Sequence, residues 1–179
     1  MVCFLLGVIF TAQWVAEIQE VLHYLREVFH HWMEVILNVQ NVGISGDKIM
    51  FTGYFAKLKE YKQAGLIPIS ISAKAPDWYN GLEYKKLAPK WAFFQEWKYG
   101  SHKGDNEYYI SQFDEQVLKP LTVEDALTDI TNLSGGDLDK VILLCYEKST
   151  DFCHRHLVAD WINKYKGSNF IIEYSKDVK

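Results

Sequence analysis

From residue 48 onward, the apolar residues of the chain follow two periods, one typical of strands and the other of helices. Strand-like runs end at Gly, Pro, Asn or Asp, whereas the stretches between them repeat apolar positions every three or four residues. The predicted strands are 48–55, 66–72, 141–147 and 169–175, and the predicted helices are 55–65, 91–98, 106–118, 122–136 and 156–167. This alternation predicts a Rossmann-like three-layer α/β domain over residues 48–179, with a mostly parallel sheet.

The first part of the chain has a different pattern. Between residues 14 and 38, apolar side chains recur at alternating spacings of four and three, which is typical of an amphipathic helix. We therefore expect an N-terminal helical extension over residues 1–43. Docking on its own domain, or self-association through residues 14–37, is favoured over binding at a membrane surface. Residues 1–16 are apolar but too short to span a membrane, so no membrane segment is predicted.

A linker separates these two patterns. Residues 41–47, NVGISGD, carry two glycines together with Asn, Ser and Asp. Because the α/β pattern is complete without the preceding helix, we expect residues 1–49 to be dispensable for folding. The codons for GDKIM can include a ribosome-binding sequence ahead of an ATG, so Met50 is a candidate translation start in a bacterial or phage gene, and residues 1–49 are then not native.

The composition is typical of a folded domain, and its charges are unevenly distributed along the sequence. Hydrophobic residues make up 49% of the 179-residue chain, which is enough to build a packed core. The three cysteines are odd in number and irregularly spaced, so we expect free thiols in a reducing cytoplasm. The net charge of -4 hides a segregation, since residues 48–103 carry ten lysines and four acids and residues 105–139 carry nine acids and one lysine. The lysine-rich block is a candidate anion-binding surface.

The densest group of reactive side chains is CYEKSTDFCHRH, residues 145–156. It lies between a predicted strand and a predicted helix, at the edge of the sheet where open α/β folds bind ligands. We expect Asp151 to cap the helix, which would leave Cys153 beside free backbone N–H groups and lower the pKa of its thiol. Cys145, on a buried strand, should react more slowly than Cys153. The helical period places His156 in solvent.

Three interpretations of this group remain open. In the first, Cys153 is a catalytic nucleophile, Glu147 or His154 carries a proton, and Arg155 clamps an anion. In the second, Cys145, Glu147, Cys153 and His154 bind zinc, although the spacing matches no conventional zinc motif. In the third, Cys145 is a buried hydrophobic residue, His154 a hydrogen-bonded core residue and Arg155 a surface ion. We favour the first interpretation and leave the cofactor unassigned.

The motif C-x-E-x5-CHR that follows the apolar strand resembles the family called domain of unknown function 488. The resemblance extends over residues 48–175, and its matching stretches are FTGYFAKL, ISISAKAPDW, LEYKKLAP, DNEYYISQF, LSGG and LLCYEKSTDFCHRHLVADWIN. It implies a single α/β domain with signature positions at Cys145, Glu147, Cys153, His154 and Arg155. It implies no particular reaction or cofactor.

The second strand departs from the wider family. Many members carry an aspartate and an arginine before the proline that ends this strand, whereas this chain has Ile71 and Ala73 there. A ligand role that depends on the missing arginine is therefore not expected. Lys74 and Ser72 are the remaining candidates for ligand binding beside Arg155, and a strand edge is the favoured alternative for both.

Aromatic side chains are interleaved with lysines in residues 84–99. This composition suits base stacking and phosphate neutralisation, but the helical spacing of the aromatics favours core packing. Taken with the CHR motif, the sequence predicts an enzyme acting on a small anionic or nucleotide-related substrate through Cys153, with nucleic acid as a further partner. The alternatives are a non-catalytic module that binds a phosphate or nucleotide, and a zinc-binding site.

Overall fold

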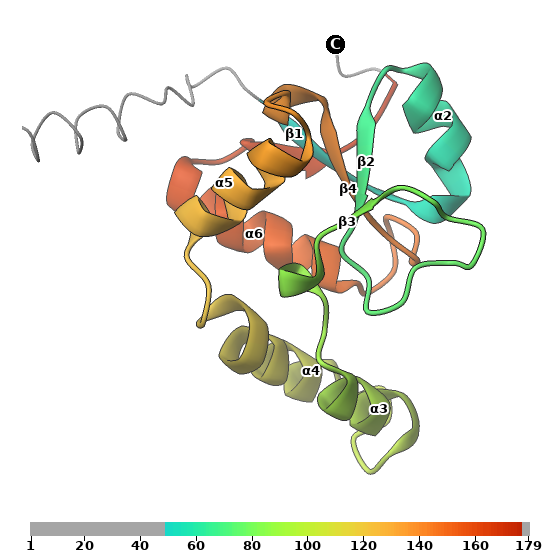
Figure 1. Cartoon of the computed structure of the whole chain (residues 1–179). Helices are drawn as coiled ribbons and strands as arrows, with labels where there is room; N and C mark the ends of the chain where they lie inside the picture. The colour runs from blue at the N-terminus through green and yellow to red at the C-terminus, as the bar shows by residue number, and fades with distance from the viewer. Residues whose placement is uncertain (1–48, 177–179) are drawn as a thin grey trace, which may run out of the picture. The chain divides into compact units, whose positions relative to one another are not determined.

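The computed structural model describes residues 49–176 (Figure 1). The predicted helical extension at residues 1–43 and the predicted self-association through residues 14–37 lie outside this range and stay predictions, as does the division of the chain at the linker. Within the described residues, no helix is both long enough and apolar enough to cross a bilayer.

The core of the domain is a sheet of five parallel strands. They are β1 (Met50–Tyr54), β2 (Ile67–Ser70), β3 (Leu82–Glu83), β4 (Val141–Cys145) and β5 (Ile171–Glu173), in the order β3-β2-β4-β1-β5. The central strand β4 is buried along its whole length, which explains why its sequence VILLC is continuously apolar rather than alternating. The register places Cys145 opposite Tyr54 at the carboxyl edge of the sheet.

Helices cover both faces of the sheet, so the predicted three-layer α/β architecture is confirmed. The helices are α2 (Leu58–Gln63), α3 (Trp91–Tyr99), α4 (Asn106–Phe113), α5 (Val123–Leu133) and α6 (His154–Lys166). Figure 1 shows α2 on one side of the sheet and α5 and α6 on the other, with α3 and α4 side by side below them. Under α2, the rings of Phe55, Tyr61 and Tyr79 pack on Ile142 and Leu144 of β4. Val158 and Ile162 of α6 are completely buried.

Short helical turns connect these elements. They are the 3-10 turns Phe55–Lys57, Lys85–Leu87 and Leu138–Lys140 and the π-turn Asp114–Leu118. The π-turn continues α4, so the single helix predicted for residues 106–118 consists of an α-helical and a π-helical part. Helix α5 begins as its sequence indicates, with the Thr122 hydroxyl accepting a hydrogen bond from the Asp125 N–H at 3.1 Å.

The start of α6 differs from the prediction. The helix begins at His154, and Cys153 occupies the N-cap position in an extended conformation (φ -152°, ψ 139°) with no side-chain cap. Asp151 lies two residues earlier in a turn, where its N–H donates to the Lys148 carbonyl at 3.1 Å and its carboxylate accepts from Thr150 at 3.2 Å. The prediction that Asp151 caps this helix is therefore wrong, because the loop makes a turn of its own before the helix starts.

Candidate functional site

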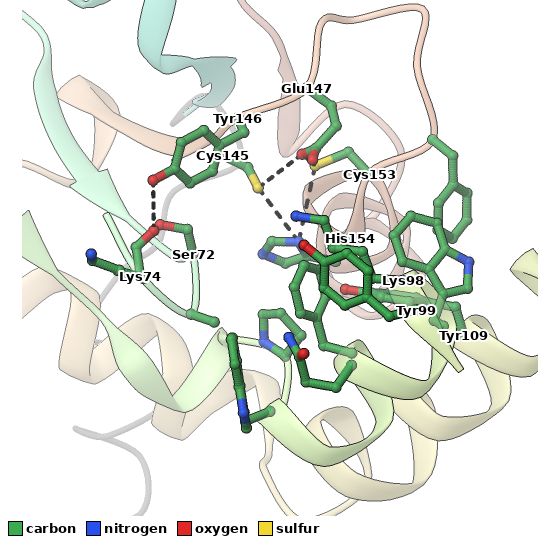
Figure 2. A pocket seen from close by; sticks show the side chains of 17 residues that line it. Ser72, Lys74, Lys98, Tyr99, Tyr109, Cys145, Tyr146, Glu147, Cys153 and His154 are labelled. Atoms are coloured by element: carbon green, nitrogen blue, oxygen red, sulfur yellow. Dashed lines mark hydrogen bonds between the residues drawn. The ribbon is translucent and has the colours of Figure 1, made fainter. Parts of the chain in front are cut away.

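The carboxyl end of β4, the loop that follows it and the first turn of α6 form one wall of a cavity of about 530 Å³. Residues 72–74, which follow β2, supply the remaining walls together with Pro89 and helices α3 and α4 (Figure 2). Seven aromatic residues line this cavity: Trp91, Phe94, Trp97, Tyr99, Tyr109, Tyr146 and Phe152. Its size falls within the range of about 300–1,000 Å³ that is common for small-molecule sites.

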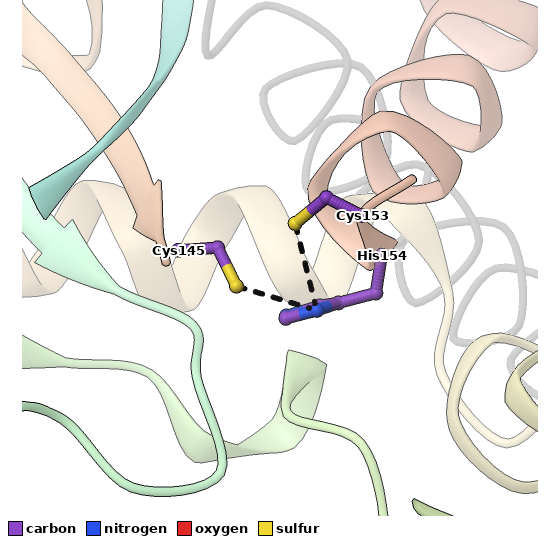
Figure 3. A group of neighbouring side chains, drawn as sticks. All are labelled: Cys145, Cys153 and His154. Carbon is purple, nitrogen blue, oxygen red and sulfur yellow. Dashed lines mark hydrogen bonds between the residues drawn. The ribbon is translucent and has the colours of Figure 1, made fainter. Parts of the chain in front are cut away.

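Four of the predicted site residues meet at the wall of this cavity. The Glu147 Oε2 atom lies 3.2 Å from the sulfur of Cys145 and 3.1 Å from that of Cys153. The His154 Nδ1 atom lies 3.5 Å from the Cys145 sulfur and 4.0 Å from the Cys153 sulfur (Figure 3). Both cysteines and the histidine are almost completely buried. We call these four side chains the donor cluster.

The imidazole of His154 is held in one orientation. Its Nε2 atom lies 2.9 Å from the carbonyl oxygen of Ile71, which can only accept a hydrogen bond. The ring therefore carries a proton on Nε2, and in the neutral ring Nδ1 presents a lone pair to the two sulfurs. Ile71 contributes to the site through this backbone carbonyl.

The two thiols differ electrostatically because they lie side by side in a buried place. The hydrogen bond from Cys145 is the largest influence that lowers the pKa of Cys153, and it acts together with His154 and the backbone N–H of Arg155 against the effect of burial. The same hydrogen bond and burial raise the pKa of Cys145 well above its ordinary value. Burial also raises the pKa of Glu147, as does the neighbouring Cys153 sulfur. The pair therefore releases its first proton from Cys153.

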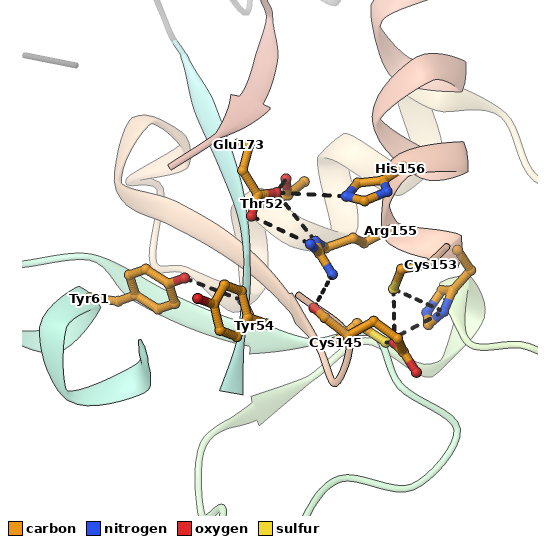
Figure 4. Close-up of polar contacts among 10 residues, drawn as sticks. Thr52, Tyr54, Tyr61, Cys145, Cys153, Arg155, His156 and Glu173 are labelled. Carbon is orange, nitrogen blue, oxygen red and sulfur yellow. Dashed lines mark hydrogen bonds and ion pairs between the residues drawn. The ribbon is translucent and has the colours of Figure 1, made fainter. Parts of the chain in front are cut away.

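Arg155 does not line the cavity, although the sequence suggested an anion clamp. Its side chain is completely buried, and its guanidinium donates to the Glu147 backbone carbonyl at 2.6 Å. It also donates to both carboxylate oxygens of Glu173, at 3.3 and 3.4 Å (Figure 4). Thr52 donates to the same carboxylate at 2.7 Å. We call Arg155, Glu173 and Thr52 the buried ion-pair network, and it anchors the loop that carries Glu147.

Ser72 and Lys74 both line the cavity. The Ser72 hydroxyl is buried and shares a hydrogen bond of 2.9 Å with Ser70, so its polar atom is engaged within the strand end. The Lys74 side chain is exposed and lies 3.2 Å from Asp77, while its carbonyl accepts from the Tyr146 hydroxyl at 2.9 Å (Figure 2). Of the two residues, Lys74 is the one whose charge can reach a ligand.

The aromatic residues of α3 correct a further expectation. The sequence favoured core packing for them, and Phe93 is indeed a core residue with 2% exposure. Trp91 and Tyr99, however, are 65% and 67% exposed at the cavity, and Phe94 and Trp97 also line it. The Trp97 Nε1–H is buried without a hydrogen-bond partner among the described residues. Helical spacing shows that these side chains lie on one face of α3, but it does not show whether that face packs against a core or lines a cavity.

The sequence analysis did not single out three cavity residues that carry polar side-chain groups and surround the donor cluster in Figure 2. They are Lys98, Tyr109 and Tyr146. Tyr146 directly follows Cys145 and Tyr109 lies in DNEYYISQF, so both fall in stretches that resemble the family. Lys98 belongs to the lysine-rich block, and its ammonium lies 5.4 Å from the centre of the Phe94 ring.

The fold and the site thus define an α/β protein with a cysteine–histidine cluster at the carboxyl edge of a parallel sheet. A comparison with family models matches residues 62–166 to the model described as the active DUF488-N3 subclade. The chain belongs to this family, and the match ends at Lys166, the last residue of α6. No curated protein and no solved structure matches the chain.

Proposed function

We propose that the protein is an enzyme that acts on a small anionic or nucleotide-related substrate, with the sulfur of Cys153 as the reacting atom. One observation carries this proposal: the Cys153 sulfur lies 3.1 Å from the Glu147 carboxylate at the wall of an aromatic cavity. A nucleophilic thiolate that faces a cavity and lies next to a group that can carry a proton is the arrangement that covalent catalysis needs. Cys145 is the poorer nucleophile because its hydrogen bond with Cys153 and its burial raise the pKa of its thiol.

The reaction we propose is a displacement. The Cys153 thiolate forms a bond to an electrophilic carbon or phosphorus atom of the substrate, and the bond from that atom to its leaving group breaks. The leaving group departs with the electron pair and takes a proton from Glu147 or from His154, the second candidate for this role. Water then displaces the sulfur and returns a proton to the same carrier.

The composition of the cavity supports the proposed substrate class. Aromatic rings provide faces for stacking a planar group, and the ammonium groups of Lys74 and Lys98 provide positive charge at the same cavity. Arg155 acts as a positioning residue in this scheme, since it holds the backbone of Glu147. The reducing environment of the cytoplasm suits the two free thiols, and we propose this location for the protein.

The test is to incubate the protein with a panel of nucleotides, nucleosides, sugar phosphates and short oligonucleotides, and to follow products by mass spectrometry. We expect the wild-type protein to convert one class, and Cys153→Ser to abolish conversion while it retains binding within a few-fold. Cys3→Ser is the matched control and should convert normally. Undiminished conversion by Cys153→Ser would refute the role of this sulfur.

The alternative function is a non-catalytic module that binds a phosphate or a nucleotide in the same cavity. In that case a member of the panel binds to both proteins, and neither protein converts it. Equilibrium dialysis beside the product assay therefore separates the enzyme from the binding module.

A further inference from the structure

The number of protons available to the donor cluster does not match the number of its contacts. Four close contacts join the two sulfurs to Glu147 Oε2 and His154 Nδ1. Each thiol has one proton, and the proton of the neutral imidazole is on Nε2, where it faces Ile71. At most two of the four contacts can then be hydrogen bonds, or three when Glu147 is protonated. In every remaining contact, lone pairs face one another in a buried place. A cation at the centre of the cluster would be attracted to all four atoms.

We propose that the donor cluster is a zinc site. Zinc is bound by the sulfurs of Cys145 and Cys153 and by Nδ1 of His154, and Glu147 Oε2 is the fourth and exchangeable donor. The metal-binding atoms of the two cysteines and the histidine all lie within 4.8 Å of one another. Two thiolates, one imidazole and one carboxylate are a ligand set that zinc prefers.

The distances within the cluster agree with a tetrahedral site. Zinc bonds of about 2.3 Å to sulfur and about 2.0–2.1 Å to nitrogen or oxygen place neighbouring donor atoms about 3.5–3.6 Å apart. The four separations between a sulfur and Glu147 Oε2 or His154 Nδ1 are 3.1, 3.2, 3.5 and 4.0 Å, so they bracket this value. Small rotations of the side chains suffice to reach it.

The surroundings of the cluster are those of a metal site. A histidine that ligates a metal usually donates its other ring N–H to a backbone carbonyl or a carboxylate, and His154 donates to Ile71 in this way. Zinc with two thiolates and a carboxylate carries one net negative charge. The buried guanidinium of Arg155 holds the backbone of Glu147, and the two cysteine sulfurs act on it through their charge. This neighbouring cation offsets the excess charge.

Zinc binding changes the chemistry of the cluster in a defined way. The ion replaces the protons of both thiols, which pass to the solvent, and the sulfurs become zinc thiolates. This inference rests on the proposed function in one respect, because the reacting form of Cys153 is then a zinc thiolate. His154 is a ligand in this state, so Glu147 is the group that leaves the metal and carries the proton.

The first experiment measures the metal content of the untagged full-length protein by mass spectrometry, followed by replacement of zinc with Co²⁺. We expect one zinc per chain and, with Co²⁺, the charge-transfer absorption that thiolate ligands produce. Histidines elsewhere in the chain cannot produce this absorption. A wild-type protein that holds no zinc after reconstitution, or a cobalt form without thiolate absorption, would overturn the proposal.

A second experiment compares zinc affinities in competition with a chelator. Cys145→Ser should weaken zinc binding by at least about 100-fold, more than the 10–100-fold typical of losing a residue behind the ligands. Cys3→Ser is the control for removing a thiol. Cys145→Ser and Cys145→Ala are also melted without metal, and an unchanged melting temperature shows that the loss of zinc affinity does not come from a changed fold. Equal zinc affinity in Cys145→Ser and the wild type would refute the site.

The zinc site and the proposed reaction can fail separately. Zinc bound without conversion of any panel compound leaves the metal site standing and removes the proposed function. Conversion that depends on Cys153 in a protein that binds no zinc supports the proposed function and refutes the metal site.

Discussion

His154 and Arg155 are neighbours in the sequence, are both buried, and belong to networks of opposite character. In the buried ion-pair network, the guanidinium of Arg155 has a partner in each direction, namely the Glu173 carboxylate and the Glu147 carbonyl. In the donor cluster, His154 Nδ1 faces two sulfurs that are also in contact with a carboxylate. One network is complete within the chain, whereas the other has more acceptors than protons.

This difference separates structure from function at one helix end. A saturated buried network contributes to stability and gives a ligand nothing to bind. A cluster of lone pairs costs stability in the metal-free protein, and it can be explained by what it binds. Arg155 shows that a charged residue inside a family signature can serve the site without touching it, because it holds the backbone of Glu147.

The largest effect on stability is expected from Arg155→Ala. Removal of one partner from a buried ion pair typically costs about 3–5 kcal/mol, and because Glu173 is one-third exposed we expect about 3 kcal/mol in urea unfolding. Lys119→Ala removes an exposed cation that pairs with Asp114 and Glu115, and it should cost much less than Arg155→Ala because solvent screens an exposed pair. A loss below 1 kcal/mol for Arg155→Ala would mean that the ion-pair network does not hold the helix end.

Glu147→Gln should change zinc affinity strongly and stability only slightly. We expect the metal-free variant to unfold within about 1 kcal/mol of the wild type, since the glutamine oxygen can still accept from a thiol. Its zinc affinity should fall about 10–100-fold, because a neutral amide replaces a carboxylate donor. Glu173→Gln is the matched control, for which we expect a loss of stability and a smaller loss of zinc affinity. If both variants lose the same amount of stability and the same amount of zinc affinity, the donor cluster and the buried ion-pair network act as one network.

The sequence predicted the donor cluster because periodicity is a local property. Cys145 ends a continuous apolar run, Glu147 follows it at the spacing of one strand face, and His154 falls on the buried face of a regular helix. The buried ion-pair network could not be predicted in this way. Arg155 meets Glu173 only because β5 lies beside β1, which is a fact of topology.

The missed parts of the fold have a similar cause. Strand β3 has only two residues, and both are exposed, so the sequence shows no burial pattern there. The strand pairs with β2, and the Tyr79 hydroxyl links the two strands by hydrogen bonds to the carbonyl oxygens of Pro68 and Leu82. The cavity was missed because α3 has the spacing of a buried helix. Whether its aromatic face meets a core depends on the position of α4, which no local pattern records.

The aromatic wall provides a smaller and separable effect. Trp91 is 65% exposed at the cavity, so Trp91→Ala should change the free energy of unfolding by no more than about 0.5 kcal/mol. Stacking of a base on an aromatic side chain is worth about 1–3 kcal/mol, so nucleotide affinity should fall about tenfold in equilibrium dialysis. Trp78 is 60% exposed and lies away from this cavity, which makes Trp78→Ala the matched control. Equal losses of affinity in the two variants would exclude stacking on Trp91.

The smallest effect is expected at the Asp129 carboxylate, which has hydrogen-bond partners but is one-third exposed and pairs with an exposed lysine. The Asp129 carboxylate accepts from Lys86 at 2.7 Å and from the Tyr84 hydroxyl at 2.8 Å, and these hydrogen bonds lower the pKa of Asp129. A lowered carboxyl pKa stabilises the folded protein above the unfolded value of about 3.9, and this contribution is lost as the pH falls below about 4. Asp129→Asn should therefore cost about 0.2–1 kcal/mol at pH 7 and nothing near pH 2, measured as the shift of the urea midpoint. A loss of more than 2 kcal/mol at pH 7 would show that a fully hydrogen-bonded carboxylate stabilises the protein strongly even when it is not buried. The contrast between Arg155 and His154 would then need a different explanation.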